Sequence, residues 1–317
     1  QGVSSAASDV YKRQALSALE NKIVSPNFKV KCTGKMELYG QTFHCWKEKG
    51  HGFMSLKNAM KQSCDTYFYE VARLLGVDRL NVTAEKFGLG KKVLGDYYDY
   101  EKSGLFPNTK WKKNNLGKGW VLGETLITGI GQGYTQTTPL QLCLMTAQIA
   151  NGGYSIKPRI VVNNNPMSLE EAKSKLQEET LHGQEKKLFK DHKNIKIVQE
   201  AMFSSTNELY GTSYKSRIDN PKYQFAGKTG TAQVKRISMR ERELDLKIEQ
   251  IPYKDRDHAL FVAYGPYVNP RYALSIIVEH GGSGSRTAAP IAKKLFKLII
   301  DRDKLRNKQK NFEEIDI

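Results

Sequence analysis

The run at residues 226–233, A-G-K-T-G-T-A-Q, limits the fold more than any other part of this chain. Its pattern favours an extended strand on which Thr229 and Thr231 share one face, because side chains alternate along a strand. Gly230 has no side chain, so a ligand could lie close to the backbone there, with the cation of Lys228 nearby. Taken alone, the Lys-Thr-Gly triplet is more typical of an edge strand with a solvated lysine. The rest of the chain has to decide between these two interpretations.

Two more strands and a helix are expected after this run. Residues 258–265 and 272–278 are mainly apolar, with β-branched side chains among them, and the segment between them is typical of a hairpin. Pro290 then begins a helix. The apolar residues that share one face of this helix are Ile291, Leu295, Leu298 and Ile299. This order predicts an α+β fold in which helices flank an antiparallel sheet and a mainly helical subdomain is inserted earlier in the chain.

The clearest helix in the earlier part of the chain follows Asp65, its expected N-cap, and ends at Gly76. Its buried stripe consists of Phe68, Val71 and Leu75. The spacing of these three residues is that of an amphipathic helix with one side against a core.

A glycine-rich loop at residues 129–133 invites comparison with nucleotide-binding loops. We reject that interpretation, because no suitable strand precedes the loop and no Lys-Ser/Thr pair follows it. Pro139 is instead well placed as the first residue of an apolar helix that runs through residue 150. Residues 192–209 predict another amphipathic helix, and residues 91–115 predict a long surface segment.

The charge balance limits the partners of the chain. Its 317 residues carry a formal net charge of +17, which favours contact with nucleic acid, an anionic membrane or an anionic polymer. The charges are spread along the chain and no module of stacking aromatic residues accompanies them, so we expect a solvated basic face and no nucleic-acid partner. No apolar run of about 18 residues and no signal-peptide pattern is present. We therefore expect any membrane anchor of the parent protein to be missing from this sequence.

Three motifs combine into a more specific pattern. They are a Ser-x-Asp at a helix start (Ser63, Asp65), the Lys-Thr-Gly strand, and a Gly-Gln-Gly-x4-Thr-Pro-Leu-Gln segment beginning at Gly131. Together they closely resemble the transpeptidase domain of class B penicillin-binding proteins, in particular the elongation-type group, penicillin-binding protein 2. The resemblance runs from Ala15 to about Phe296, with the motifs in family order. The stretches that match it most closely are residues 65–69, 129–142, 226–234, 257–259 and 266–272.

The resemblance implies an acyl transfer from the D-Ala-D-Ala end of a peptidoglycan stem peptide to an amine of a neighbouring stem, with β-lactams as mimics of the donor. Ser63 would relay a proton between the leaving amine and a pair of lysines, and Asp65 would replace the more usual asparagine as an orienting group. Lys228 would supply positive potential, while Thr229 and Thr231 contact the substrate carboxylate and the backbone N–H of Thr231 forms half of the oxyanion hole. Without the other motifs, the serine and the aspartate would read as an ordinary helix cap.

The nucleophile motif of this family, Ser-x-x-Lys, is absent from the sequence. Ser8 falls near its expected position, but Tyr11 stands three residues later and Lys12 comes one place late. One residue turns a helical side chain by about 100°, so Lys12 cannot simply replace the missing base. We therefore expect residues 1–14 to be non-native or truncated sequence. As written, the chain is expected to be inactive and not to be acylated by penicillin.

Three of the four cysteines crowd around a histidine in a segment that we expect to be irregular, with the spacing C-x12-C-x5-H-x12-C. Cys32, Cys45, His51 and Cys64 offer four ligands suited to tetrahedral zinc. The resemblance adds that members of this group can hold zinc ahead of the Ser-x-Asp motif, where all but Cys32 match clearly. Such a zinc would be structural, because four protein ligands leave no open position. The alternative is a Cys32–Cys45 disulfide with a surface histidine. Cys143 lies among apolar residues and is expected in the core.

Other functions that use the same motifs stay open. The nearest are a β-lactamase and a D,D-carboxypeptidase, and a different class is a penicillin-sensing domain or a non-catalytic partner of a wall-building complex. For a transpeptidase, the expected partners are stem peptides, the lipid-linked precursor polymer and a membrane-embedded glycosyltransferase, at the periplasmic face of the bacterial inner membrane. The expected organisation is a transpeptidase domain over residues 15–300, incomplete at its N-terminus, followed by a polar tail over residues 301–317.

Overall fold

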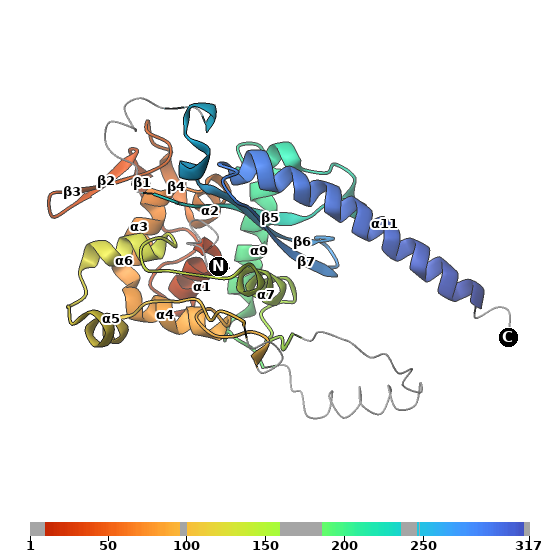
Figure 1. Ribbon diagram of the computed structural model, residues 1–317, viewed down its shortest axis with the longest axis horizontal. Coiled ribbons are helices and arrows are strands. Elements are labelled where there is room, and N and C mark those ends of the chain that lie inside the picture. Colours follow the sequence, from red (N-terminus) through yellow and green to blue (C-terminus); the bar gives the residue numbers. More distant parts are fainter. Residues whose placement is uncertain (1–9, 96–99, 159–185, 236–245, 247, 314–317) are drawn as a thin grey trace.

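The computed structural model describes residues 10–95, 100–158, 186–235, 246 and 248–313 of the chain (Figure 1). The helices of eight residues or more are α1 (Tyr11–Glu20), α3 (Asp65–Leu75), α4 (Val77–Lys86), α5 (Thr109–Leu116), α6 (Leu122–Gly129), α7 (Pro139–Ala150), α9 (His192–Asn207) and α11 (Ala289–Glu313), and the shorter α2 spans Leu56–Gln62. The strands are β1 (Lys29–Cys32), β2 (Lys35–Leu38), β3 (Gln41–His44), β4 (Gly52–Ser55), β5 (Ala226–Ala232), β6 (His258–Gly265) and β7 (Tyr272–Val278).

The largest sheet is the antiparallel one that the sequence predicts. Its strands lie in the order β5-β6-β7, and β6 and β7 have the bounds expected for the hairpin. In the register, Lys228 of β5 lies opposite Val262, and Val262 lies opposite Ser275 of β7. The strand with the Lys-Thr-Gly triplet is therefore an edge strand, so one of its sides carries no neighbouring strand among the described residues. Together with the surrounding helices, this sheet confirms the α+β class.

Each face of the sheet belongs to a different hydrophobic core, because the side chains of β6 alternate. Phe261 and Ala263 pack in a core with Phe296 of α11, whereas Val262 and Tyr264 join the larger core that the helices form. Figure 1 shows α11 running along the sheet and the other long helices gathered on the far side of it. The strand β5 thus lies at the junction of the sheet and the helical part.

Helix α11 buries a different face from the expected one. Ile291 and Leu298 are 40% and 66% exposed, while the side chains against the sheet are Ala292, Phe296 and Ile300. Alanines at the contact let the helix approach the sheet closely, and the larger aliphatic residues are left on the solvent side. The helix continues through Glu313, so the polar segment from residue 301 is helical up to that point, and it projects away from the body of the molecule (Figure 1).

The helices α3, α7 and α9 lie close to where the sequence predicts them. In α3 the stripe of Phe68, Val71 and Leu75 is buried, and Gly76 ends the helix with φ of 78°. Helix α7 begins at Pro139. The side chain of Thr138 caps it by accepting a hydrogen bond from the backbone N–H of Gln141. Helix α9 stops two residues short of the expected end.

The expectation of an irregular segment around the cysteines is wrong. That segment forms two antiparallel pairs, β1 with β4 and β2 with β3. Four-residue strands leave little periodicity in a sequence, which explains the difference. The expected surface segment at residues 91–115 is mostly exposed or half-buried where it is described, but it contains α5, in which Lys112 is buried with its ammonium 2.5 Å from Glu124 Oε1.

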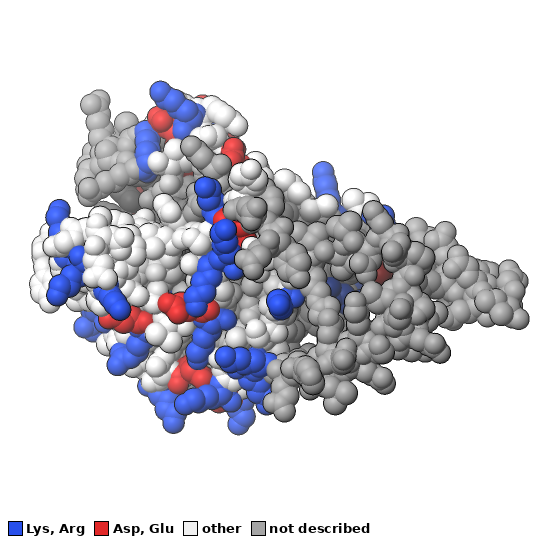
Figure 2. All heavy atoms as spheres, turned by 60° about the horizontal axis from the view of Figure 1, so that its bottom comes forward, with Lys and Arg blue, Asp and Glu red and all other residues white. Residues whose placement is uncertain are grey.

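Basic side chains are distributed over the face shown in Figure 2. The Lys and Arg side chains that are coloured there lie with Asp and Glu side chains among them. None of the helices in the described part of the chain combines the length and the apolarity that a bilayer crossing requires.

Candidate active site

A lysine–serine pair links the edge strand to the helical part. The ammonium of Lys228 donates a hydrogen bond to the hydroxyl of Ser63 at 2.6 Å, across 165 residues of sequence. Lys228 has no exposed surface, and its Nζ also lies 2.9 Å from the backbone oxygen of Thr229. The structure therefore brings together the two motifs that the sequence assigns to one cleft.

Ser63 is held in an unusual backbone conformation. It is the C-cap of α2, with φ of 55° and ψ of 48°, in the left-handed region where glycine is the usual residue. The backbone N–H of Cys64 closes this turn by donating to the carbonyl of Ala59 at 2.8 Å. A side chain in this region costs of order 1 kcal/mol or more, so the surrounding contacts have to hold Ser63 in this conformation, in which its hydroxyl accepts from Lys228.

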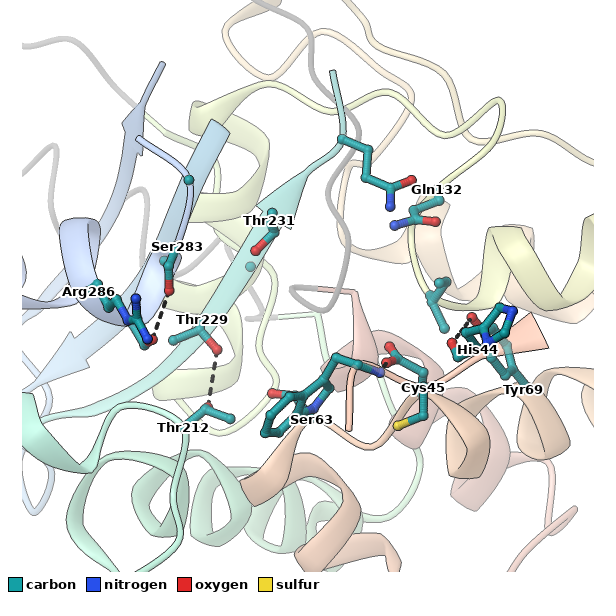
Figure 3. A pocket seen from close by; sticks show the side chains of 18 residues that line it. His44, Cys45, Ser63, Tyr69, Gln132, Thr212, Thr229, Thr231, Ser283 and Arg286 are labelled. Carbon is teal, nitrogen blue, oxygen red and sulfur yellow. Dashed lines mark hydrogen bonds between the residues drawn. The ribbon is translucent and has the colours of Figure 1, made fainter. Parts of the chain in front are cut away.

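A pocket of about 650 Å³ opens in front of this pair (Figure 3). Thr229, Gly230 and Thr231 line one side of it, as the strand periodicity predicts, and Ser63 lies at its base. Lys228 does not line the pocket, because its side chain points to the opposite face of β5 from the two threonines and is covered completely. The lysine thus acts on the pocket through Ser63 rather than by direct contact.

Several residues of the pocket were not predicted from the sequence. They are Gln132 of the glycine-rich segment, Trp46, Thr212, and the turn with Ser283, Ser285 and Arg286. The run Gly-Gly-Ser-Gly-Ser-Arg after β7 is the signal that could have revealed that turn, since small and hydroxyl-bearing residues between a strand and a helix often border a ligand. Gln132 could have been found from the motif in which it stands.

Asp65 is half-buried in the wall of the pocket and is not the N-cap of α3. The helix begins at Asp65 itself, and its carboxylate accepts a hydrogen bond from the backbone N–H of Trp46 at 2.9 Å and another from the hydroxyl of Tyr11. Burial, and after it the negative charge of Cys45, raise the pKa of Asp65 to about 7 against the lowering effect of these two donors. The expectation of a capping aspartate is therefore wrong, since this side chain turns inward.

Tyr11 is the residue of α1 that faces the lysine–serine pair. Its ring stacks on Phe68 at 3.9 Å between centroids, and the ammonium of Lys228 lies 5.4 Å from the ring centroid. The side chain is fully buried. Ser8, three residues earlier, lies outside the described residues. The helix position that points at the pair thus carries tyrosine where the Ser-x-x-Lys pattern would place its lysine.

The four predicted metal ligands lie together. The ligand atoms of Cys32, Cys45, His51 and Cys64 are all within 4.8 Å of one another, and the Sγ atoms of Cys32 and Cys45 each lie 3.5 Å from Nδ1 of His51. All of these cysteines are free thiols. The strands β1, β3 and β4 and the turn between α2 and α3 place them, and Cys45 also lines the pocket.

The cluster favours a thiolate, which is the form of cysteine that binds metals. A hydrogen bond from Cys64 is the main cause that lowers the pKa of Cys45 to about 3, and the same contact raises the pKa of Cys64. Burial acts against ionisation of Cys32, but hydrogen bonds from Thr66 and His51 outweigh it and lower its pKa. Sulfur ligands about 2.3 Å from a tetrahedral zinc stand about 3.8 Å apart, so a set of donors within 4.8 Å fits such an ion.

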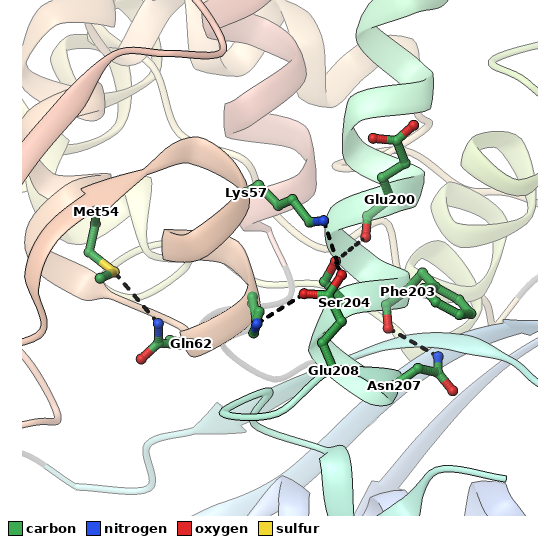
Figure 4. A network of polar contacts seen from close by, with 9 residues as sticks. Met54, Lys57, Gln62, Glu200, Phe203, Ser204, Asn207 and Glu208 are labelled. Carbon is green, nitrogen blue, oxygen red and sulfur yellow. Dashed lines mark hydrogen bonds and ion pairs between the residues drawn. The ribbon is translucent and has the colours of Figure 1, made fainter. Parts of the chain in front are cut away.

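An ionic network holds the helix that carries Ser63 (Figure 4). The carboxylate of Glu208, just after α9, pairs with Lys57 at 3.0 Å and with Lys61 at 2.9 Å, and it accepts a hydrogen bond from Ser204 at 2.8 Å. Partial burial would raise the pKa of Glu208, but the hydrogen bonds from Lys61, Ser204 and Lys57 lower it to about 2. The network ties α2 to the end of α9.

The connection continues to the edge strand. The backbone N–H of Thr212 donates to the carbonyl of Lys61 at 3.1 Å, and the hydroxyl of Thr229 donates to that of Thr212 at 3.1 Å (Figure 3). The last turn of α2, the loop after α9 and β5 therefore form one hydrogen-bonded frame around the pocket.

Among known proteins, the chain is similar to transpeptidases. A family model described as penicillin binding protein transpeptidase domain matches residues 13–297. The peptidoglycan D,D-transpeptidase MrdA of Salmonella typhimurium is 34% identical over 304 residues, which cover 95% of this chain and 47% of the relative, and that of Escherichia coli K12 is 32% identical over the same length. The chain spans about half the length of the curated relatives it matches.

Two solved structures share the fold over almost the whole chain. The chain is similar to Pseudomonas aeruginosa PBP2 in complex with WCK 5153, with a TM-score of 0.76, 34% identity, and coverage of 94% of this chain and 61% of that one. It is also similar to Helicobacter pylori PBP2 in a complex with MreC, with a TM-score of 0.78, 30% identity, and coverage of 94% and 50%.

Proposed function

Because the chain belongs to the penicillin-binding protein transpeptidase domain family, we propose that it is the transpeptidase part of a peptidoglycan D,D-transpeptidase active in cell elongation. The acyl donor would be a stem peptide that ends in D-Ala-D-Ala, delivered on the lipid-linked precursor polymer, and β-lactams would occupy the same pocket. The observation that supports this proposal most is the 2.6 Å contact between Lys228 and Ser63 beside the threonines of β5.

The proposed roles follow from the placement of the side chains. Ser63 relays a proton to the leaving amine, and Lys228 keeps its hydroxyl polarised and oriented. Thr229 and Thr231 hold the substrate from the side, Gly230 lets its backbone approach β5, and the N–H of Thr231 contributes to an oxyanion site. Asp65 keeps α3 and the segment at Trp46 in place, which orients the wall of the pocket on that side.

We further propose that this sequence is catalytically inactive as written. Its α1 presents Tyr11, and not a lysine, to the pair, and the sequence contains no Ser-x-x-Lys. A buried phenol that donates to Asp65 cannot act as the base that activates a serine nucleophile, because its proton is already engaged and its ordinary pKa is near 10.

Tyr11 stands three residues after Ser8, so a few substitutions can restore the missing motif and test the proposed inactivity. The substitutions Ala6→Pro, Ala7→Gly and Tyr11→Lys together create Pro-Gly-Ser-x-x-Lys with its serine at position 8. We expect the unaltered chain to take up no labelled penicillin and not to turn over a D-Ala-D-Ala thioester, and the triple variant to do both. Adding Ser8→Ala or Lys228→Met should abolish both activities. Labelling of the unaltered chain at Ser8 would contradict the proposed inactivity.

The same experiment separates the alternatives. Transfer of the acyl group to an added amine supports a transpeptidase, and release to water alone supports a β-lactamase or a D,D-carboxypeptidase. Uptake of penicillin by the triple variant without turnover of the thioester supports a penicillin-sensing domain. For the parent protein we infer a location at the periplasmic face of the bacterial inner membrane and a membrane-embedded glycosyltransferase as partner. A partner of the MreC type is inferred from the Helicobacter pylori complex.

A structural zinc ion is proposed for the cluster of Cys32, Cys45, His51 and Cys64. A bound zinc ion would neutralise the thiolates and cross-link β1, β3 and the segments next to β4 and α3, with no position left for water. Metal analysis of purified protein should give one zinc per chain, and Cys64→Ser should lose it. The matched control is Cys143→Ser, which lies outside the cluster and should keep the metal. Zinc-free protein with Cys32 and Cys45 oxidised together would refute the proposal in favour of a disulfide.

A further inference from the structure

A ligand that carries a carboxylate needs a cation within hydrogen-bond distance in the pocket. Lys228 is not placed to be that cation. An ammonium has three N–H donors, and that of Lys228 lies within hydrogen-bond distance of Ser63 Oγ at 2.6 Å, Thr229 O at 2.9 Å and Thr229 Oγ1 at 3.4 Å. The side chain has no exposed surface and does not line the pocket. Its charge can raise the potential of the pocket, but its donors cannot reach a carboxylate there.

Arg286 is the cation that does line the pocket. It belongs to a five-residue π-helical turn, Gly284–Ala288, between β7 and α11, and its side chain is exposed. In the described part of the chain, no carboxylate pairs with its guanidinium and no carbonyl accepts from it. None of the described carboxylates or carbonyls therefore engages the planar fork of five N–H donors that a guanidinium offers to a ligand.

The surroundings of Arg286 suit an anion. The hydroxyls of Ser283 and Ser285 lie 3.0 Å apart beside it, and Figure 3 shows Arg286 next to Ser283 on the side of the pocket where Thr229 and Thr231 lie. The carboxylate that lines the pocket among the described residues is that of Asp65, and it already accepts hydrogen bonds from Tyr11 and Trp46. Among the described residues, no acidic neighbour therefore competes for the guanidinium.

Close backbone contact fixes this turn against β5. A Cβ atom added to Gly284 would lie 2.6 Å from the backbone oxygen of Gly230 and 2.3 Å from that of Leu260, so only glycine permits the observed approach. The hydroxyl of Thr287 donates to the carbonyl of Gly281 at 2.8 Å and closes the turn on its other side. The turn that carries Arg286 is thus packed directly against the strand that carries the two threonines.

We propose that Arg286 binds the terminal carboxylate of the ligand, with Thr229, Thr231, Ser283 and Ser285 as hydroxyl partners. This inference rests on the proposed function, because a D-Ala-D-Ala peptide and a β-lactam both carry that carboxylate. A guanidinium matches a carboxylate with two parallel hydrogen bonds, which gives orientation as well as affinity. In this arrangement Lys228 serves Ser63 and Arg286 serves the ligand, so the two cations have separate tasks.

The test compares two probes on four proteins. An N-acylated Lys-D-Ala-D-Ala peptide and its C-terminal amide are titrated by NMR into the wild-type chain, Arg286→Gln, Arg286→Lys and Arg217→Gln. Arg217 is the matched control, an arginine paired with Asp219 outside the pocket. We expect the wild-type chain to prefer the acid, Arg286→Gln to lose about 10-fold or more of its affinity for the acid and none for the amide, and Arg286→Lys to keep part of the preference. Arg217→Gln should behave as the wild type.

The possible failures are distinguishable. Equal affinity of Arg286→Gln and the wild type for the acid would overturn the role of Arg286 and leave the proposed function intact. Equal loss of both probes would mean that Arg286 only supports the fold of the pocket, which also overturns the inference. A wild-type chain that binds neither probe would remove the proposed function together with the inference that depends on it.

Discussion

Replacing Arg13 by methionine should make this protein more stable. Arg13 lies in α1 with no exposed surface, and burial lowers the pKa of its guanidinium from 12.5 to about 9. Its Nη1 donates to the carbonyl of Leu80 at 3.1 Å, and its Cζ lies 4.1 Å from the centroid of the Phe106 ring. Its Nε and Nη2 have no acceptor among the described residues. A buried cation with so few partners lowers the free energy of unfolding, and an apolar side chain of similar length would remove that penalty.

The lowered pKa gives the size of the effect. At about 1.4 kcal/mol per pH unit, a fall from 12.5 to about 9 corresponds to a penalty of about 5 kcal/mol on the charged form. The contact with Phe106 offsets about 1 kcal/mol of this penalty, and the hydrogen bond to Leu80 offsets about 1 kcal/mol more. Methionine removes the penalty and both contacts, so the free energy of unfolding should rise by about 3 kcal/mol. For a chain of this size, that corresponds to a midpoint of thermal unfolding about 6 °C higher.

The same pKa predicts a pH dependence that identifies the cause. Between about pH 9 and pH 12.5 the unfolded chain keeps the proton of Arg13 and the folded protein has released it, so stability rises with pH in this window. Below that window the penalty is fully present. Urea unfolding of the wild type and of Arg13→Met at pH 8 and pH 10 measures both effects, with Arg73→Met on the outer face of α3 as a control that should change little. The reasoning is refuted if Arg13→Met is no more stable than the wild type at pH 8, or if the gap between them does not narrow at pH 10.

Two further predictions concern the frame of the pocket. The pKa of Glu208 is about 2 in the folded protein against an ordinary 4.5, so its interactions contribute stability above pH 4.5 that is lost as the pH falls towards 2. Glu208→Gln should flatten the pH dependence of unfolding in that window, as followed by circular dichroism, and an unchanged slope would contradict the network. Gly284→Ala should destabilise the protein by about 1–3 kcal/mol, because the new methyl group would press on the backbone oxygens of Gly230 and Leu260. Gly119→Ala, which adds a methyl group in open space, should be close to neutral in the same denaturant titration.

Much of the sheet could be predicted because the local sequence of its strands is enough to recognise them. The runs at β6 and β7 are apolar, β-branched and bounded by turn residues, and the structure gives them the expected bounds. The strands β1 to β4 could not be predicted, since each has only four residues, and in β3 and β4 two exposed residues follow one another, so little alternation remains. Strand β1 pairs with β4 across about 20 residues of chain, and that pairing is not visible in the local sequence of either strand.

The face of α11 shows a different limit. The apolar residues Ile291, Leu295 and Leu298 form a regular stripe, but the sheet contacts the stripe of alanines and Phe296 beside it. Periodicity identifies a helix, whereas the choice of the buried face depends on how closely the neighbouring sheet approaches. Small residues allow the closer approach, and the larger stripe is left outside.

The site could be predicted to the extent that its residues stand in motifs. Ser63 and Lys228 come from separate motifs, and the structure places their polar atoms in contact. Thr212 could not be predicted, because it lies in a loop and reaches the pocket only through the contact of that loop with Thr229 of β5. For Arg286 the glycine- and serine-rich run before it indicates a turn, but its place at the pocket depends on the packing of that turn on β5. The inward turn of Asp65 could not be predicted either, since its partners Tyr11 and Trp46 are distant in sequence and are brought to it by the fold.

Cys45 belongs to two structures at once, since it is a member of the thiol cluster and part of the pocket wall. A metal ion in the thiol cluster and a ligand in the pocket would therefore be separated by the side chain of Cys45 alone. Thermodynamic reciprocity then demands that any ion which alters the affinity of the pocket for a peptide has its own affinity altered by the peptide, by the same factor. Titrating zinc in the presence and absence of a saturating D-Ala-D-Ala peptide would measure that factor, and a value of one would show that the shared wall is rigid.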